Sequence, residues 1–316
     1  MKLNIGIMGA GGIAVKFVQA ASMVSDVEVC AVASKSLGRA RSFAEANHIP
    51  HAFGDYQAML SSGLINAVYV ATTGNFHYEN ILLALNSGMH VLCEKNMVAT
   101  TKEAERIFAL AKEKRLFVME AMWSCFVPSV QKAHQWIAEG RIGIVHLATY
   151  TGGINALPEH RIYNRALGGG ALYDLGVYPI EIVGYILGKR PFLLRSHVQI
   201  GTTGVDETVS LIVDYEGCDG MLACTCHARI PSPSGFYGSK GFIQLEKTHM
   251  ADHACLYDGQ FNLIERFDAP FENGFQFEIT HIRDCISKGL IESPIMPWQA
   301  TLDSIRIYEG ALHHDA

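Results

Sequence analysis

Short apolar runs alternate with amphipathic segments of ten or more residues through the first third of this 316-residue chain. Period-two and 3.6-residue patterns predict strands and helices, respectively. Strands that alternate with helices of this length pair in parallel, because each helix carries the chain back across a face of the sheet. The predicted strands are Leu3–Met8, Val27–Ala33, Asn66–Ala71, Met89–Cys93 and Leu116–Met119, and the predicted helices are Ile13–Met23, Leu37–Asn47, Tyr78–Ser87 and Thr101–Lys114. The pattern predicts a doubly wound parallel sheet.

The pattern changes after about Glu120, where extended segments follow one another with short turns. The predicted strands here are 145–152, 192–200, 207–215, 221–227, 236–245 and 254–257, and the predicted helices are 129–139, 171–187, 275–288 and 298–312. Consecutive strands with short turns indicate a large, mostly antiparallel open sheet. We therefore expect two domains, residues 1–121 and an α+β domain of residues 122–316, whose C-terminal helix packs back on the first domain.

Composition excludes several function classes. The net charge is −6 and no Lys/Arg run stands out, so we expect no nucleic-acid partner. No apolar run approaches the roughly 18 residues that a membrane span needs, and the N-terminus leads straight into a strand, so we expect a cytoplasmic protein without a membrane partner. The eight cysteines lie mostly in apolar runs and are expected to be reduced thiols. The Cys224-Thr-Cys226-His227 segment lacks a second pair of ligands, so we expect no metal site.

A glycine-rich turn joins the first predicted strand to the first predicted helix. It has the form G-x-G-x-x-A, and its candidate cofactor-binding residues are Gly9, Gly11, Gly12, Ile13 and Ala14. The first glycine permits a tight turn, the second lets the backbone approach a pyrophosphate, and Ala14 allows close helix–strand packing. Alone the motif is weak, and a plain strand–helix turn is the alternative. Its setting between strand and helix favours a dinucleotide site at the helix N-terminus.

The end of the second predicted strand indicates which dinucleotide binds. An NAD site places Asp or Glu about 20 residues past the glycines to bind the ribose 2′-hydroxyl. Here the strand is followed by Ser34 and Lys35, with Arg39 one turn later and no carboxylate. The two basic side chains could neutralise a 2′-phosphate, which favours NADP over NAD. The alternative is that they are solvated surface charges.

Polar residues follow the next two strands at the carboxyl edge of the sheet, where ligands bind in such folds. Thr72, Asn75 and His77 come first; Asn75 could cap the next helix, and His77 could orient a ligand or simply cap and pack. Glu94 and Lys95 follow the fourth strand. The Lys95 ammonium could bind a substrate hydroxyl and stabilise a developing alkoxide, with Glu94 holding it or contacting the cofactor. The alternative is a surface ion pair.

A Gly-rich segment, 168–170, leads into the predicted helix that carries Asp174 and Tyr178. At a spacing of i, i+4 both side chains lie on one face of an α-helix. An acid and a phenol on one face suggest a pair that handles a proton. A buried hydrogen bond between the two is the alternative.

Taken in order, these segments resemble the glucose–fructose oxidoreductase, inositol dehydrogenase and rhizopine-catabolism oxidoreductase family, and within it the dimeric trans-dihydrodiol and D-xylose dehydrogenase branch. The resemblance covers most of the chain and rests on GAGGIA, ASKSLGRARSFAEANHIP, ATTGNFHYENILLALNSGMHVLCEKN, MEAMWSCFVP and LGGGALYDLGVYPIE. It implies an N-terminal Rossmann domain, an α+β second domain and a homodimer formed through the C-terminal sheet. The implied enzyme is an NADP-preferring dehydrogenase of CH–OH groups in a carbohydrate, polyol or dihydrodiol.

The resemblance also implies residue roles. The residues that match catalytic positions of the family are His77, Lys95, Asp174 and Tyr178. Four residues match substrate-binding positions of the family: Trp123, Arg161, Asp174 and Tyr178. Lys35 and Arg39 match the positions that read the 2′-phosphate.

Three positions depart from the family pattern. Asn96 replaces the Pro that usually follows the lysine, which affects how the turn presents the amine. Cys125 replaces an Arg, which could change the substrate charge that is preferred, and Thr73 replaces a Pro.

The leading hypothesis is hydride transfer between nicotinamide and a secondary alcohol or hemiacetal carbon. In it Tyr178, assisted by the cation of Lys95, exchanges the hydroxyl proton while Asp174 orients the substrate. Two alternatives remain open. One is a sensor that binds the cofactor without turnover, and the other is a cofactor-assisted glycoside hydrolase.

Overall fold

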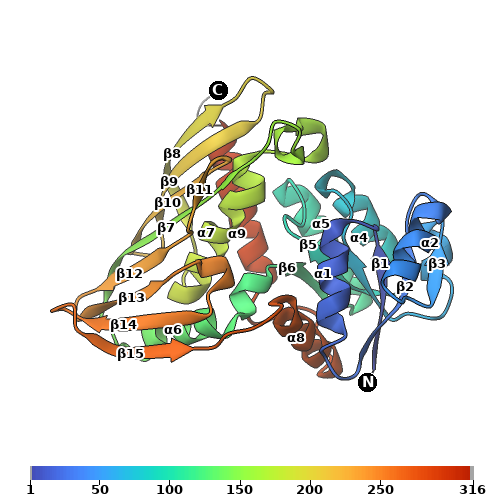
Figure 1. The fold of residues 1–316 in the computed structure, drawn as a ribbon, viewed down its shortest axis with the longest axis horizontal. Helices are drawn as coiled ribbons and strands as arrows, with labels where there is room; N and C mark the ends of the chain where they lie inside the picture. Colours follow the sequence, from blue (N-terminus) through green and yellow to red (C-terminus); the bar gives the residue numbers. More distant parts are fainter. Residues whose placement is uncertain (1, 314–316) are drawn as a thin grey trace. The chain divides into compact units, whose positions relative to one another are not determined.

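The computed structural model describes residues 2–313, and the chain divides into two compact units (Figure 1). The first unit contains the N-terminal chain to Trp123 together with Asn273–Thr301. The second contains Ser124–Glu272 and the chain from Leu302 onward. The expected second domain, 122–316, thus differs from the second unit at residues 122–123 and 273–301. Helix α8 (Phe275–Ser287) lies in this stretch and packs against α1 (Gly12–Ala21) of the first unit.

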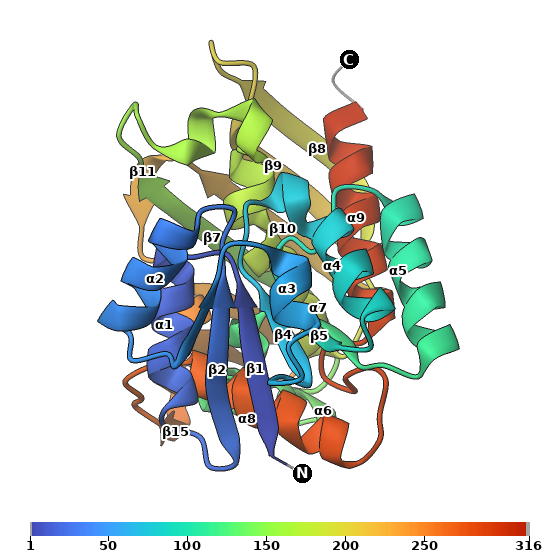
Figure 2. The same ribbon diagram turned by 90° about the vertical axis from the view of Figure 1, so that its right-hand side faces the viewer.

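The first unit is built on a six-stranded sheet in which every pairing is parallel, in the order β3-β2-β1-β4-β5-β6. Its strands are β1 (Leu3–Met8), β2 (Val27–Ala33), β3 (His51–Phe53), β4 (Ala67–Val70), β5 (His90–Glu94) and β6 (Val118–Ala121). Helices lie on both faces of this sheet (Figure 2). They are α1, α2 (Leu37–Ala46), α3 (Tyr56–Leu60), α4 (His77–Asn86), α5 (Thr101–Lys114) and α8. The predicted doubly wound parallel sheet is confirmed.

Burial explains why the strands of the first unit read as apolar runs. All four residues of β4 are buried, as expected for a strand covered by helices on both faces. The strand order reverses between β1 and β4, which places the topological switch point beside the glycine turn. Ligands bind at the carboxyl ends of the strands at such a point.

The second unit is built on a nine-stranded sheet in the order β15-β14-β13-β12-β7-β10-β9-β8, with β11 paired to β7 off this path. Its strands are β7 (Val145–Asn155), β8 (Phe192–Ile200), β9 (Asp206–Asp214), β10 (Asp219–Thr225), β11 (His227–Ile230), β12 (Ser234–Gly238), β13 (Gly241–Leu245), β14 (His253–Asp258) and β15 (Leu263–Asp268). Only the pairing of β10 with β7 is parallel. The predicted mostly antiparallel sheet is confirmed.

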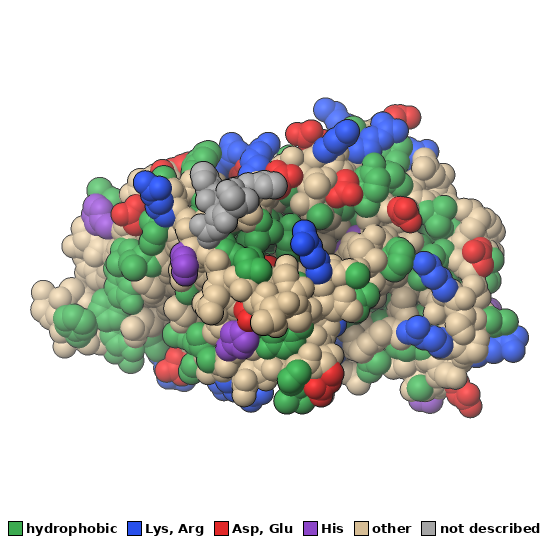
Figure 3. Space-filling view, turned by 90° about the horizontal axis from the view of Figure 1, so that it is seen from above, with side chains coloured by type: hydrophobic (Ala, Val, Ile, Leu, Met, Phe, Trp, Pro, Cys, Tyr) green, Lys and Arg blue, Asp and Glu red, His purple; other side chains and the backbone are tan. Residues whose placement is uncertain are grey.

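One face of the large sheet is packed by helices and the other is open. Helices α6 (Pro128–Ala138) and α7 (Val177–Leu187) pack against it, and α9 (Trp298–His313) ends the described chain. Burial alternates along β10, where Met221 is 52% exposed while Leu222 is 2% exposed. Figure 3 shows hydrophobic side chains that reach the surface of the molecule among charged ones.

Several boundaries differ from the predicted ones. The predicted strand 236–245 is a hairpin of β12 and β13, because Ser239 and Lys240 form a turn between them. The predicted strand 221–227 divides into β10 and β11. The elements β3, α3 and β15 were not predicted; the first two are only three and five residues long, too short for a clear periodic signal. The predicted helix 171–187 begins with a π-helical turn, Leu172–Gly176.

All eight cysteines are buried thiols. Within residues 2–313, the helices are too short or too polar to cross a bilayer.

Candidate active site

The glycine turn of the first unit has the geometry that a bound pyrophosphate requires. Gly9 has φ +108°, and a Cβ there would lie 2.7 Å from the backbone oxygen of Ala71, so only glycine fits. A Cβ at Gly11 or Gly12 would meet no heavy atom within 4 Å, so the backbone there faces open space. Helix α1 begins at Gly12, and no side chain caps its N-terminus. An anion can therefore approach its first-turn N–H groups, and a dinucleotide fits this turn.

The loop after β2 carries basic side chains and no carboxylate. Ser34 is 5% exposed, and its N–H donates to Phe53 O at 3.1 Å. Lys35 is exposed, and its amine lies 3.9 Å from the centroid of the Phe76 ring. Arg39 is exposed on α2, whose N-terminus is capped by the Ser36 side chain. The predicted 2′-phosphate residues thus lie at one end of the sheet with their charges accessible, as binding of a phosphate requires.

The loop after β4 is held by its own side chains. Asn80 donates to Thr72 Oγ1 at 3.1 Å, and Thr73 donates to Asn75 Oδ1 at 2.7 Å. The expected capping by Asn75 is wrong. The helix α4 begins at His77 with no side-chain cap, and a short 3-10 turn over Gly74–Phe76 precedes it.

His77 joins this loop to the turn that follows Lys95. Its side chain is buried, with Nδ1 2.9 Å from Asn96 O and Nε2 3.0 Å from Thr72 O. Burial lowers the pKa of His77, and the charge of Lys95 acts in the same direction, whereas the carbonyl contacts raise it. A neutral imidazole has one N–H, so it donates to one carbonyl at a time. Both ring nitrogens face the backbone, an arrangement suited to positioning the turn.

Lys95 lies at the carboxyl edge of the sheet, directly after β5. It is half-buried, and the Lys95–Asn96 peptide bond is cis. Glu94, the last residue of β5, is 7% exposed and accepts a hydrogen bond from the Tyr69 hydroxyl on β4. Strand pairing and the His77 contact bring Glu94, Lys95 and His77 together at this edge, as the sequence predicted.

A second buried carboxyl group lies near Glu94. Glu278, in the first turn of α8, is 0% exposed, and among the described residues neither of its oxygens has a hydrogen-bond partner. Burial raises the pKa of Glu278 well above its usual value, and the charge of Glu94 raises it further. The charged form is costly to bury without partners, so this environment favours the protonated form of Glu278. Its sequence context, a predicted amphipathic helix, contained no signal of this.

In the second unit, Arg161 and Asp174 form an ion pair. Arg161 Nη2 lies 2.7 Å from Asp174 Oδ1, and the Asp174 side chain is 11% exposed while that of Arg161 is 50% exposed. Such a bond restricts the orientation of the carboxylate. The two residues that the sequence placed on the substrate side are therefore adjacent.

The turn that carries Asp174 is not α-helical. Leu172–Gly176 is π-helical, and α7 starts at Val177. The expectation that Asp174 and Tyr178 stand at i, i+4 of one α-helix is therefore wrong, because the wider turn changes the angle between them. Single π turns inside helices are frequent at functional sites.

A buried carboxylate anchors this π turn. Asp206 on β9 is 4% exposed, and its Oδ2 accepts the Leu172 N–H at 2.5 Å. A Cβ at Gly170 would collide with the Asp206 carboxylate, so glycine is needed for this approach. Sequence reasoning missed Asp206. The one available signal was a charged residue at the start of a predicted strand.

Tyr178 lies on α7 beside two other rings of the second unit. Its ring centroid is 5.5 Å from that of His249, with the planes tilted by 51°. Tyr150 on β7 is 1% exposed, and its pKa is raised by burial and next by the charge of Tyr178. The phenol of Tyr178 is half-buried, so it keeps access to solvent or a ligand.

An aromatic pair lies in the first unit. The rings of Trp123 and Phe275 stack at 5.4 Å with an interplanar angle of 15°. Trp123 is half-buried, whereas Phe275 is 5% exposed. Cys125, two positions after the predicted substrate-side Trp, is 0% exposed, so the position that carries Arg in the family pattern is an uncharged buried thiol here.

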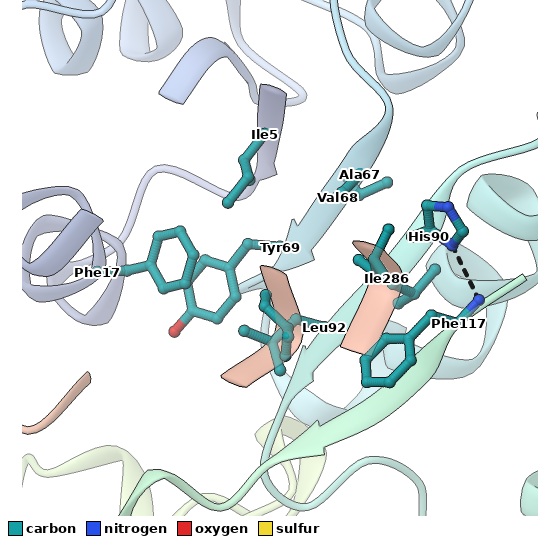
Figure 4. Close-up of a pocket in the computed structure, with 11 residues that line it drawn as sticks. Ile5, Phe17, Ala67, Val68, Tyr69, His90, Leu92, Phe117 and Ile286 are labelled. Atoms are coloured by element: carbon teal, nitrogen blue, oxygen red, sulfur yellow. Dashed lines mark hydrogen bonds between the residues drawn. The ribbon is translucent and has the colours of Figure 1, made fainter. Parts of the chain in front are cut away.

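A small pocket in the first unit lies away from this edge. It is apolar and is formed between the sheet and the helices α1 and α8, with Phe17, Tyr69, Leu92 and Ile286 among its lining residues (Figure 4). Its imidazole, His90, accepts the Phe117 N–H at 2.9 Å. The pocket offers no reactive group to a substrate. Across the described residues, no three His, Cys, Asp or Glu side chains are arranged to hold a metal ion.

Comparison with known proteins agrees with this geometry. Residues 3–122 match an oxidoreductase family with an NAD-binding Rossmann fold, and residues 130–244 match the GFO/IDH/MocA C-terminal domain. The chain is 33% identical over 309 residues to trans-1,2-dihydrobenzene-1,2-diol dehydrogenase of Xenopus tropicalis, a match that covers 94% of this chain and 93% of that relative.

Two solved structures resemble the model. One is a 3-ketoreductase from Actinomadura kijaniata in complex with NADP and TDP-benzene, with a TM-score of 0.88, 25% identity and coverage of 99% of this chain and 97% of that one. The other is an aldose–aldose oxidoreductase from Caulobacter crescentus, with a TM-score of 0.90 at 22% identity and coverage of 99% and 97%. The resemblance to the aldose–aldose oxidoreductase shows a shared fold only.

Proposed function

Because this chain belongs to the GFO/IDH/MocA oxidoreductase family, it is an NAD(P)-dependent oxidoreductase, and we propose that it is an NADP-preferring dehydrogenase of a ring-shaped sugar, polyol or trans-dihydrodiol. The observation that carries the proposal is the carboxyl edge of the first unit. There an uncapped helix N-terminus follows β1, two accessible basic side chains follow β2, and Lys95 follows β5 of the same parallel sheet. When bound, the nicotinamide supplies the hydride acceptor or donor.

The first unit holds the cofactor. The turn 9–14 binds the pyrophosphate through backbone N–H groups, and Lys35 and Arg39 bind the 2′-phosphate. The remaining proposed cofactor contacts are Ser34, Thr72, Asn75, His77, Glu94 and Lys95. His77 acts by positioning, since both of its ring nitrogens face backbone carbonyls.

Three side chains carry the chemistry at the substrate hydroxyl. Tyr178 exchanges the hydroxyl proton, and the cation of Lys95 favours the phenolate form and the developing alkoxide. Asp174, held by Arg161, orients the substrate through its carboxylate.

The substrate side favours an uncharged ring. The half-buried ring of Trp123, stacked on the buried Phe275 ring, offers a flat apolar surface, and the buried thiol of Cys125 offers no charge to an anionic group. A trans-dihydrodiol or an uncharged cyclic polyol matches this chemistry better than a sugar phosphate does.

The decisive experiment is a panel of trans-dihydrodiols, cyclic polyols and aldoses with NADP and with NAD, followed at the absorbance of the reduced nicotinamide. Tyr178→Phe and Lys95→Met should each reduce kcat by about 100-fold or more if both act in the transition state. Turnover within a few-fold of the wild type in both variants would remove these roles. Bound NADPH that no substrate oxidises or forms would favour a sensor, and sugar release without net NADPH turnover would favour a glycoside hydrolase.

A homodimer through the open face of the large sheet is part of the proposal. Several large apolar side chains of this sheet are exposed; they include Phe192, Leu194, Ile200 and Met221, each 48–55% exposed. Apolar patches of this kind mark interfaces. Sedimentation should give twice the chain mass, and Met221→Asp should shift the measured mass towards that of the monomer.

We also propose a cytoplasmic location, supported by the eight buried thiols, and cell fractionation tests it.

A further inference from the structure

Glu120 is a buried carboxylate beside the proposed lysine. It lies on β6, is 3% exposed, and pairs in register with Cys93 of β5. The next pair along these strands is Ala121 with Glu94, the last residue of β5, and Lys95 follows Glu94 directly. Glu120 therefore lies beside the end of β5, and its carboxylate contacts the turn of Lys95 through the Met97 N–H.

Both oxygens of Glu120 are engaged. Oε1 accepts the Met97 N–H at 2.8 Å, and Oε2 accepts the Thr301 hydroxyl at 2.7 Å. The first bond holds the turn that begins at Lys95, where Asn96 stands in place of the family's proline. His77 holds the same turn from the other side through Asn96 O. Glu120 on β6 and His77 at the start of α4 thus hold this turn together.

Burial and the neighbours of Glu120 act on its carboxyl group in opposite directions. Burial raises the pKa of Glu120, whereas the Thr301 and Met97 hydrogen bonds and the charge of Lys95 lower it. A buried carboxylate that merely satisfied backbone groups could be replaced by a neutral amide without effect on a nearby amine. A carboxylate that acts as a counter-ion could not, because loss of its charge leaves the ammonium less stable.

We propose that Glu120 is a positioning residue for the reaction: it fixes the turn that presents Lys95 and supplies the negative charge that keeps its amine protonated. The inference rests on the proposed role of Lys95 in catalysis. Glu120 does not touch the substrate or the cofactor in this account. It acts through the lysine.

The test uses the full-length protein and three variants. Glu120→Gln keeps the size of the side chain and removes the charge, Glu120→Asp keeps the charge with a shorter reach, and Thr301→Val removes one hydrogen bond without altering the charge. The first readout is the rate at which acetic anhydride labels Lys95 in the absence of cofactor, measured by mass spectrometry against exposed Lys102 in the same molecule. Only the deprotonated amine reacts.

We expect Glu120→Gln to raise the labelling rate of Lys95 at neutral pH by about tenfold, the effect of one pKa unit. Thr301→Val should stay within about twofold of the wild type, because the charge remains. An unchanged rate in both Glu120→Gln and Glu120→Asp overturns the inference. If Glu120→Gln does not fold, Glu120→Asp decides, since a carboxylate moved away from the turn should label Lys95 faster than the wild type does.

The second readout is kinetic. Glu120→Gln should lower kcat by about 10–100-fold through misplacement of the amine, while the NADP dissociation constant stays within about threefold. Its activity should also fall at a lower pH on the alkaline side than that of the wild type. An equal loss in NADP affinity and kcat, with an unmoved pH profile, would mean a structural role alone. Because labelling needs no turnover, its result stands even if the dehydrogenase proposal fails.

Discussion

Replacement of Glu278 by methionine should stabilise the protein. Two carboxyl oxygens buried without partners cost about 1–3 kcal/mol, and Met fills a similar volume without polar atoms. The free energy of unfolding should therefore rise by about 1–3 kcal/mol near neutral pH, which corresponds to about 2–4 °C in Tm for each kcal/mol. A matched control is Glu105→Met on the exposed face of α5, which should change stability by less than about 0.5 kcal/mol.

The pH dependence of this effect has a definite sign. The pKa of Glu278 is raised in the folded protein, chiefly by burial, so the folded state holds the proton more tightly than the unfolded chain does. Its contribution to stability is complete below the unfolded-chain value of about 4.3 and is lost as pH rises through the raised folded value. The stabilisation by methionine should therefore grow as pH rises above about 4.3, up to the raised folded value.

Thermal and urea unfolding of the wild type and both variants at several pH values measures the effect. The reasoning is refuted if Glu278→Met is less stable than the wild type at pH 8, or if the difference between them shrinks as pH rises. Either result would mean that a partner stabilises the ionised carboxylate of Glu278.

Three further predictions concern the glycine turn, the basic pair after β2 and the carboxylate that holds the π turn. Gly9→Ala should abolish NADP binding and lower stability by about 1–3 kcal/mol, because a Cβ would lie 2.7 Å from Ala71 O at φ +108°; calorimetry and thermal unfolding check it, and near-normal binding would contradict it. The double change Lys35→Ala and Arg39→Ala should weaken NADP binding by about 100-fold and leave NAD binding within about threefold; an equal loss for both cofactors would show that the pair does not read the phosphate. Asp206→Asn should raise the KM of the substrate or lower kcat by about tenfold without altering NADP affinity, since it loosens only the π turn of the second unit; unchanged steady-state kinetics would count against this role.

Much of the first unit followed from the sequence. Its strands are buried on both sides and therefore read as short apolar runs, and β1, β2 and α5 have the predicted bounds. The glycine turn was recognisable because the local backbone requires glycine there: Gly9 has a positive φ, and the backbone at Gly11 faces open space. Backbone requirements of this kind involve only consecutive residues, so the sequence alone can reveal them.

The second unit was predicted in class but less well in detail. Strands of an open sheet have one exposed face, where side chains vary freely, so their ends and turns are weakly marked. The hairpin of β12 and β13 read as one strand, and the π turn read as α-helix. A π turn has no sequence signature, because the extra residue is accommodated by contacts such as that of Asp206 with Leu172.

The sequence by itself determined the fold class, the cofactor turn and the candidate reactive side chains, because residue type and spacing specify local backbone geometry and chemistry. Only the tertiary structure decided that His77 faces two carbonyls, that Glu120 holds the turn after Lys95, and that Glu278 is buried with no hydrogen-bond partner among residues 2–313. These facts depend on which distant strands and helices meet. A charge's environment is set by neighbours far away in the chain, and no local pattern records it.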